Sequence, residues 1–179
     1  PKHFVSLSRS RGMNLSLVDL SPVPDGGTAT EAFANTVETA QQAEQLGYDR
    51  FWVAEHHGRG NRLAGTTPEV LLGHLAAETE SIRLGSGAVL LNHYSPLKVA
   101  ELFGVLDGLA PGRIDAGLGR ANGSPAVDRA LGTARHVENP DDDHAEKITA
   151  VINHLYEDYP DGHEYSEISI PRSNADAPI

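Results

Sequence analysis

The sequence contains no cysteine, so disulfide bonds, thiolate zinc sites and cysteine nucleophiles are excluded. It also lacks any apolar run of the roughly 18 residues that a transmembrane helix needs. Basic residues are scarce, because 14 Lys and Arg stand against 25 Asp and Glu, for a formal net charge of −11. This imbalance disfavours nucleic acid or an anionic membrane surface as a partner, although one arginine with a few backbone N–H groups can still bind a small phosphorylated ligand.

The composition that remains is that of one ordinary globular domain. Hydrophobic residues make up 39% of the 179 residues and charged residues 22%. The first dozen residues, "PKHFVSLSRSRG", are basic but have no long apolar core, so we expect no secretory signal and a cytoplasmic protein. Met13 resembles a natural start, and residues 1–12 are therefore interpreted as an N-terminal extension.

A strand followed by a helix recurs four times along the rest of the chain. Alternating or continuous apolar segments predict strands over residues 14–20, 49–55, 81–91 and 113–119. Apolar residues at helical spacing, together with the Thr67–Pro68 and Ser95–Pro96 start signals, predict helices over residues 30–46, from 68 onward, 96–109 and 141–157. Strand–helix repeats with short connections predict an α/β fold in which helices cover a parallel sheet.

Polar side chains gather where the predicted strands end. Glu55 and His56 end the second strand, Asn92 follows the third, and Arg120 follows the fourth. In parallel α/β folds the ligand site lies at the carboxyl ends of the strands, in barrels and open sheets alike. The sequence therefore predicts that these residues share one site.

The stretch "FWVAEHHGRGN", residues 51–61, allows three interpretations. Its Glu and two His residues could bind a metal, supply a catalytic imidazole, or simply close a strand with polar groups. Neighbouring strand residues point to opposite faces, and no helical H-x-x-x-H pattern lies nearby, so we expect no metal site. From spacing alone, His56 fits either a proton carrier or a strand-end histidine bonded to a backbone carbonyl.

Several ordered motifs resemble the bacterial luciferase-like flavin monooxygenases. They are "MNLSLVDL", "FWVAEHH", "IRLGSGAVLLNHYSPLKVAE" and "LDGLAPGRIDAGLGRA". The resemblance implies a (β/α)8 barrel that uses reduced flavin mononucleotide (FMN) with oxygen, or a deazaflavin coenzyme in one branch of the family. Residues 13–157 would form the first half of such a barrel, and residues 158–179 would lead to a fifth strand that the sequence lacks.

The resemblance also assigns roles to residues. His56 matches the family's catalytic imidazole beside the flavin, and Gly87–Ala88 matches a non-proline cis peptide that supports the flavin ring. Arg120 matches an arginine that reaches the flavin phosphate. Glu55 and Asn92 complete the predicted cofactor-binding set, although Glu55 could instead orient an imidazole or fix the strand end.

Two functions from different classes follow from this resemblance. The first is an enzyme, a flavin-dependent monooxygenase that acts on a small organic substrate with oxygen and receives its reduced flavin from a separate reductase. The second is a non-catalytic flavin-binding or assembly subunit, or a fragment of a longer protein. Because a half-barrel leaves two strand edges unpaired, we expect a homo-oligomer or a second half-barrel chain to close it.

Overall fold

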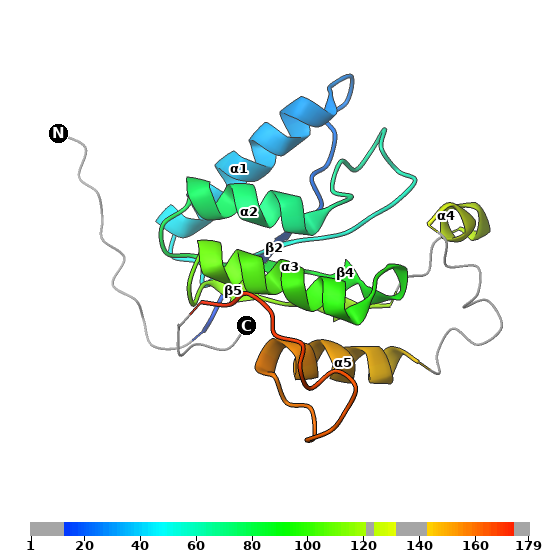
Figure 1. The fold of residues 1–179 in the computed structure, drawn as a ribbon. Helices are drawn as coiled ribbons and strands as arrows, with labels where there is room; N and C mark the ends of the chain where they lie inside the picture. The colour runs from blue at the N-terminus through cyan, green and yellow to red at the C-terminus, as the bar shows by residue number, and fades with distance from the viewer. Residues whose placement is uncertain (1–12, 121–123, 132–142, 174–179) are drawn as a thin grey trace.

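The structure is a computed structural model that describes residues 13–120, 124–131 and 143–173 (Figure 1). The expected N-terminal extension, residues 1–12, lies outside the described residues, as do residues 174–179 of the expected C-terminal loop. Among the described residues, none of the helices combines the length and the apolar composition needed to span a lipid bilayer.

Strands and helices alternate along the described chain. The strands are β1 (Ser16–Asp19), β2 (Arg50–Val53), β3 (Arg83–Ser86), β4 (Val89–Leu90), β5 (Ile114–Asp115) and β6 (Leu118–Gly119). The helices are α1 (Ala29–Gln45), α2 (Pro68–Glu78), the short 3-10 helix η1 (Leu91–His93), α3 (Pro96–Leu109), α4 (Pro125–Ala130) and α5 (His144–Tyr156).

The main sheet is parallel throughout, and its strand order β1-β2-β3-β5 follows the chain. Strands β4 and β6 form a second parallel pair; β4 follows β3 and β6 follows β5 in the chain. Each strand therefore pairs with the one before it, as in the first half of a (β/α)8 barrel. The predicted parallel α/β fold is confirmed.

Helices α1, α2 and α3 cover one face of this sheet, and α5 lies beside α3 (Figure 1). The covered face contributes Phe51, Val53, Leu84 and Ile114 to the core, all of them almost fully buried. Apolar residues of the three helices pack against them, and this burial is the main stabilising term of the fold.

Local signals explain where the helices begin and end. Thr28 and Glu31 form a capping box at the start of α1, and Gly47, with φ +79°, follows its end. Proline is the first residue of α2 and of α3, as the sequence predicts. Helix α4 was not predicted from the sequence, although Ser124–Pro125 repeats the same start signal and Ser124 caps that helix.

Two of the predicted strands are each divided in two. The segment 81–91 splits into β3 and β4 around Gly87, and the segment 113–119 splits into β5 and β6 around Gly117. The Ser86 hydroxyl donates to the Gly117 carbonyl (2.7 Å) and accepts from the Gly117 amide (3.0 Å), so it satisfies backbone groups at the break. A methyl group added at Gly117 would overlap the Ser86 carbonyl, which explains the need for glycine there.

Candidate functional site

A cavity of about 390 Å³ lies at the carboxyl ends of the strands. Its walls come from the segment after β2, from β4 and η1, and from the region of α4. The lining residues are Glu55, His56, His57, Gly58, Arg59, Leu90, His93, Ser124 and Val127. Two of the residues predicted from sequence, Glu55 and His56, therefore share one cavity.

His56 is half-buried and held by its backbone, whose amide donates to the Gly65 carbonyl (2.8 Å). Its ring makes no hydrogen bond to any residue that the structure describes. The alternative of a strand-end histidine bonded to a backbone carbonyl is therefore not what the described residues show. The imidazole stays available to a ligand in the cavity.

Gly58 lets α4 approach this histidine segment. It has φ +70°, a conformation that favours glycine, and an added Cβ would lie 2.8 Å from Val127 Cγ2. The tight turn after Glu55–His57 and the close contact with α4 both depend on this one residue. Ser124 and Val127 were not singled out from the sequence, because nothing local links a helix after the fourth strand to the end of the second.

Glu55 is only 2% exposed and accepts three hydrogen bonds. The Tyr94 hydroxyl donates to Oε1 at 2.7 Å, and the Leu90 amide donates to Oε2 at 2.7 Å. His57 Nε2 lies 2.6 Å from Oε1. Glu55 therefore contacts an imidazole and also ties the segment after β2 to β4, so its hydrogen bonds are those expected from both interpretations left open by the sequence.

Two other ionisable groups beside Glu55 have shifted pKa values. Burial raises the pKa of Tyr94 well above its usual value, and its hydrogen bond to Glu55 adds to the shift. Burial also raises the pKa of Glu69, at the start of α2, with the charge of Glu55 acting in the same direction. Both groups therefore hold their protons more firmly, in a low-dielectric region next to the cavity.

The predicted flavin support lies one strand away from His56. The Gly87–Ala88 bond is a non-proline cis peptide, the conformation that the family resemblance predicts. The Gly87 amide donates to the Val53 carbonyl (2.8 Å), so this bond is held against the end of the strand that leads to His56. Gly87 is exposed and Ala88 half-buried, which leaves this backbone open to a planar ligand.

Trp52 occupies the space below that backbone. Its ring lies so close to Gly85 that a methyl group there would overlap it, and a Cβ on Gly87 would lie 3.2 Å from Trp52 Cβ. The two glycines therefore allow the indole to lie against β3. Trp52 is the single tryptophan of the sequence, and it stands next to the predicted cofactor support.

Arg120 follows β6 and is exposed. It does not line the cavity with His56, but β6 pairs with β4, and an added Cβ on Gly119 would lie 3.1 Å from Ala88 Cβ. Arg120 therefore directly follows Gly119, which packs against Ala88. That placement is compatible with a phosphate attached to a ligand on the Gly87–Ala88 backbone.

Asn92 is 8% exposed, in η1. Its Oδ1 atom is buried and has no hydrogen-bond partner among the described residues. A buried amide oxygen without a donor costs free energy, and a bound ligand with an N–H or O–H group would remove that cost. Asn92 does not line the cavity with His56, so its predicted assignment to the cofactor site rests on this orphaned atom alone.

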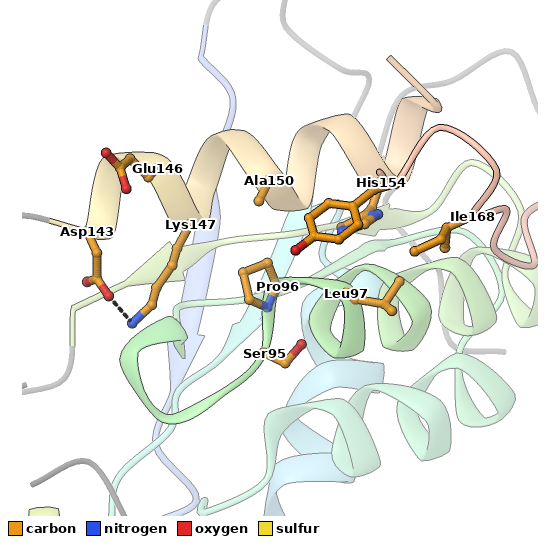
Figure 2. Close-up of a pocket in the computed structure, with 10 residues that line it drawn as sticks. Ser95, Pro96, Leu97, Asp143, Glu146, Lys147, Ala150, His154 and Ile168 are labelled. Carbon is orange, nitrogen blue, oxygen red and sulfur yellow. Dashed lines mark ion pairs between the residues drawn. The ribbon is translucent and has the colours of Figure 1, made fainter. Parts of the chain in front are cut away.

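A second cavity, of about 450 Å³, lies between the start of α3, helix α5 and the segment after α5. Figure 2 shows the Asp143–Lys147 ion pair (2.9 Å) at one end and His154 with Ile168 at the other. None of the residues predicted from sequence lines it. Although it is the larger cavity, it lacks the strand-end polar groups that parallel α/β folds use for chemistry, and we assign the site to the smaller one.

Known proteins resemble this chain in sequence and in structure. The sequence model of the luciferase-like monooxygenase family matches residues 13–168. N-acetyl-S-alkylcysteine monooxygenase of Bacillus subtilis (strain 168) is 45% identical over 164 residues, which are 92% of this chain and 48% of that protein. This chain spans about half the length of the curated relatives it matches.

Solved structures that are at least 25% identical to this chain in sequence share its fold. Apo-MsnO8 superimposes with a TM-score of 0.76 at 41% identity, over 91% of this chain and 46% of that one. The oxygenating constituent of 3,6-diketocamphane monooxygenase from Pseudomonas putida, solved in complex with FMN, gives 0.70 at 25% identity, over 83% and 40%. The fold, the matched sequence and the strand-end site agree, and this chain belongs to the luciferase-like monooxygenase family.

Proposed function

We propose that this chain forms the flavin-binding half of a monooxygenase that uses reduced flavin and oxygen on a small organic substrate. The observation that carries the proposal is the placement of His56, whose ring has no hydrogen-bond partner among the described residues, one strand away from the Gly87–Ala88 backbone, which is exposed at Gly87. Two of the relatives named above, N-acetyl-S-alkylcysteine monooxygenase and the 3,6-diketocamphane monooxygenase constituent, are monooxygenases, and the second was solved with FMN.

The residues present fit a flavin. Gly87 and Ala88 offer an open backbone to a flat ring, Asn92 Oδ1 lacks a donor that a flavin N–H can supply, and Arg120 lies on the adjoining strand end. When bound, reduced flavin supplies the electrons and the reactivity toward oxygen. FMN is our first candidate, and a deazaflavin coenzyme is the alternative.

The chemistry of the chain itself is proton transfer and positioning. His56 would give or take a proton at the cavity, because an imidazole titrates near neutral pH. The cavity walls would keep substrate and cofactor together and limit access of water. We expect the reduced flavin to come from a separate reductase, and the rest of the barrel from a second copy of the chain, another half-barrel chain or the remainder of a longer protein.

A titration with FMN tests this proposal directly. Trp52, the single tryptophan, lies against Gly85 and Gly87, so its emission is expected to fall as flavin binds, together with the fluorescence of the flavin. Intact mass and sedimentation velocity on the same sample give the chain length and the number of copies. The same titration with the deazaflavin coenzyme decides between the two cofactors.

Turnover of His56→Ala, with a flavin reductase supplied, tests the catalytic role. We expect a loss of about 100-fold or more in kcat with little change in flavin affinity. His74→Ala is the matched control, because His74 is exposed on α2 and does not line the cavity. Flavin binding without turnover in the wild-type protein would support a non-catalytic subunit, and no binding at all would contradict the proposal.

A further inference from the structure

The hydrogen bonds around Glu55 leave it little capacity for a ligand. Each carboxylate oxygen already has a protein donor within 2.7 Å, and Oε1 has two neighbours, Tyr94 and His57. The side chain is fully buried. A group so surrounded acts on the cavity through its neighbours rather than by direct contact.

The carboxyl groups of Glu55 and Glu69 lie in different surroundings. Glu69 is partly buried and has an Oε2 atom without a hydrogen-bond partner among the described residues, and its pKa is raised by burial and by Glu55. Glu55 instead receives hydrogen bonds from Tyr94 and Leu90. Both oxygens of Glu55 therefore face protein donors, an arrangement that suits a carboxylate, which can only accept.

His57 is the residue that this arrangement controls. It lines the cavity, and its ring packs edge-on against His93 with the ring centroids 5.6 Å apart. Nε2 lies 2.6 Å from Glu55 Oε1, whereas Nδ1 makes no hydrogen bond to a described residue. An ionised Glu55 requires a proton on Nε2, and a neutral ring then has Nδ1 as an acceptor.

We propose that Glu55 is a positioning residue, locked by Tyr94 and Leu90, that fixes His57 in the tautomer protonated on Nε2. Nδ1 of His57 then serves as the acceptor for a ligand N–H or O–H group in the cavity. This inference rests on the proposed function for the identity of that ligand. It assigns His57 a role beside His56, and it moves Glu55 from the cofactor-binding set to the support beneath it.

Glu55→Gln gives a prediction that a purely structural role would not produce. The Leu90 amide keeps the oxygen of the new carboxamide on its own side, so the NH₂ group faces His57 Nε2. That nitrogen must then accept, and the proton moves to Nδ1. The change is isosteric, and Tyr94 can accept from the same NH₂ group. We therefore expect the tautomer of His57 to invert.

The experiment is nitrogen NMR of the imidazoles in the whole 179-residue chain, labelled with ¹⁵N-histidine at neutral pH, without cofactor. Loss of signals in His57→Gln assigns the ring. We expect the Nε2–H tautomer in the wild-type protein and in Tyr94→Phe, which keeps the Glu55 carboxylate, and the Nδ1–H tautomer in Glu55→Gln.

The wild-type spectrum alone can overturn the inference, even if a variant fails to fold. A His57 ring protonated on Nδ1, or one that exchanges between tautomers, would contradict it. An unchanged tautomer in a folded Glu55→Gln protein would do the same. Because no cofactor is present, a chain that fails to bind flavin still gives a clear result, so the two proposals fail separately.

Discussion

The two faces of the sheet are built from different chemistry. On the face covered by helices, Phe51 and Val53 are fully buried among apolar side chains. The opposite face, which alternates with it along each strand, carries Val18 at 55% exposure, the half-buried Trp52 and a network of charged residues. In a closed barrel that second face would be the interior.

The charged network lies across three strands. Asp115 of β5 accepts from Arg83 Nη2 at 2.7 Å and from Arg50 Nε at 3.0 Å. Charged groups joined in this way are suited to an enclosed interior, where their hydrogen bonds replace water. The comparison shows that half of a barrel has one finished core, whereas its other face is arranged for enclosure.

The largest expected effect would come from the covered face. Phe51→Ala should lower the free energy of unfolding by about 3–5 kcal/mol, because it leaves a cavity among α1–α3 and the sheet. Trp52→Ala, the neighbouring residue on the other face, should cost less than half as much. Urea unfolding followed by far-UV circular dichroism measures both. Equal losses would mean that the second face is also enclosed in solution.

The charged network should come next. Asp115→Asn should lower stability by about 1–2 kcal/mol, since it removes the charge that pairs with both arginines and all three groups are only partly exposed. The loss should shrink with added salt. Glu101→Gln, in the exposed pair with Lys98, is the control and should change stability by about 0.5 kcal/mol or less. A cost no larger than that of the control would remove the distinction between network and surface pair.

Glu44 lies near the end of α1, at the rim of the covered face, and its replacement tests the hydrogen bonds there. Its carboxylate accepts from the backbone amides of Ser81 (2.6 Å) and Ile82 (2.8 Å), just before β3. Burial alone would raise its pKa, but the hydrogen bonds from Ile82, Ser81 and Glu80 outweigh burial and lower it. Glu44→Ala should cost about 1 kcal/mol at pH 7, whereas Glu38→Ala on the same helix should be near neutral.

The pH dependence of that loss has a definite sign. A lowered pKa means that the contribution of Glu44 is complete above the unfolded value of 4.5 and disappears as the pH falls below it. Urea midpoints of the wild type and Glu44→Ala should therefore converge between pH 7 and pH 3. A difference that stays constant over this range would assign the effect to packing instead.

The smallest effect should come from α5, at the edge of the covered side. Burial lowers the pKa of His154, with Glu101 opposing and His163 adding to the shift. The unfolded chain therefore binds this proton more readily, and stability should fall as the pH drops below 6.5, by less than about 1 kcal/mol. His154→Gln should flatten that decline in urea unfolding at pH 7.5 and pH 5.5. An equally steep decline in the variant would exclude His154 as its source.

Sequence patterns predicted the elements that repeat a local rule. Proline at the start of α2 and α3 and the apolar spacing along α1 are each set by neighbours in the chain. The breaks at Gly87 and Gly117 could not be predicted from local sequence, because they lie beside hydrogen bonds between Ser86 and Gly117, which are 31 residues apart in the sequence. The division of β3 from β4 therefore needed the structure.

The candidate site shows the same limit. His56, Glu55 and Asn92 could be singled out because each follows a strand. Tyr94 and Glu55, which share a hydrogen bond, are 39 residues apart in the sequence, and Glu55 also bonds His57, two residues further on. No local sequence pattern indicates that these three side chains are linked. Val127 lines the cavity because α4 packs against Gly58, a tertiary contact that no local sequence pattern indicates.

The strand order β1-β2-β3-β5 has a consequence for synthesis of the protein. Each strand of this sheet pairs with the strand that precedes it in that order, so a nascent chain leaving the ribosome can add one strand–helix unit at a time to an already paired edge. Among the strands that the structure describes in this sheet, none depends on a partner beyond the next strand in the order. The edge presented at every stage is the template for the next strand, which makes vectorial folding a built-in property of this architecture.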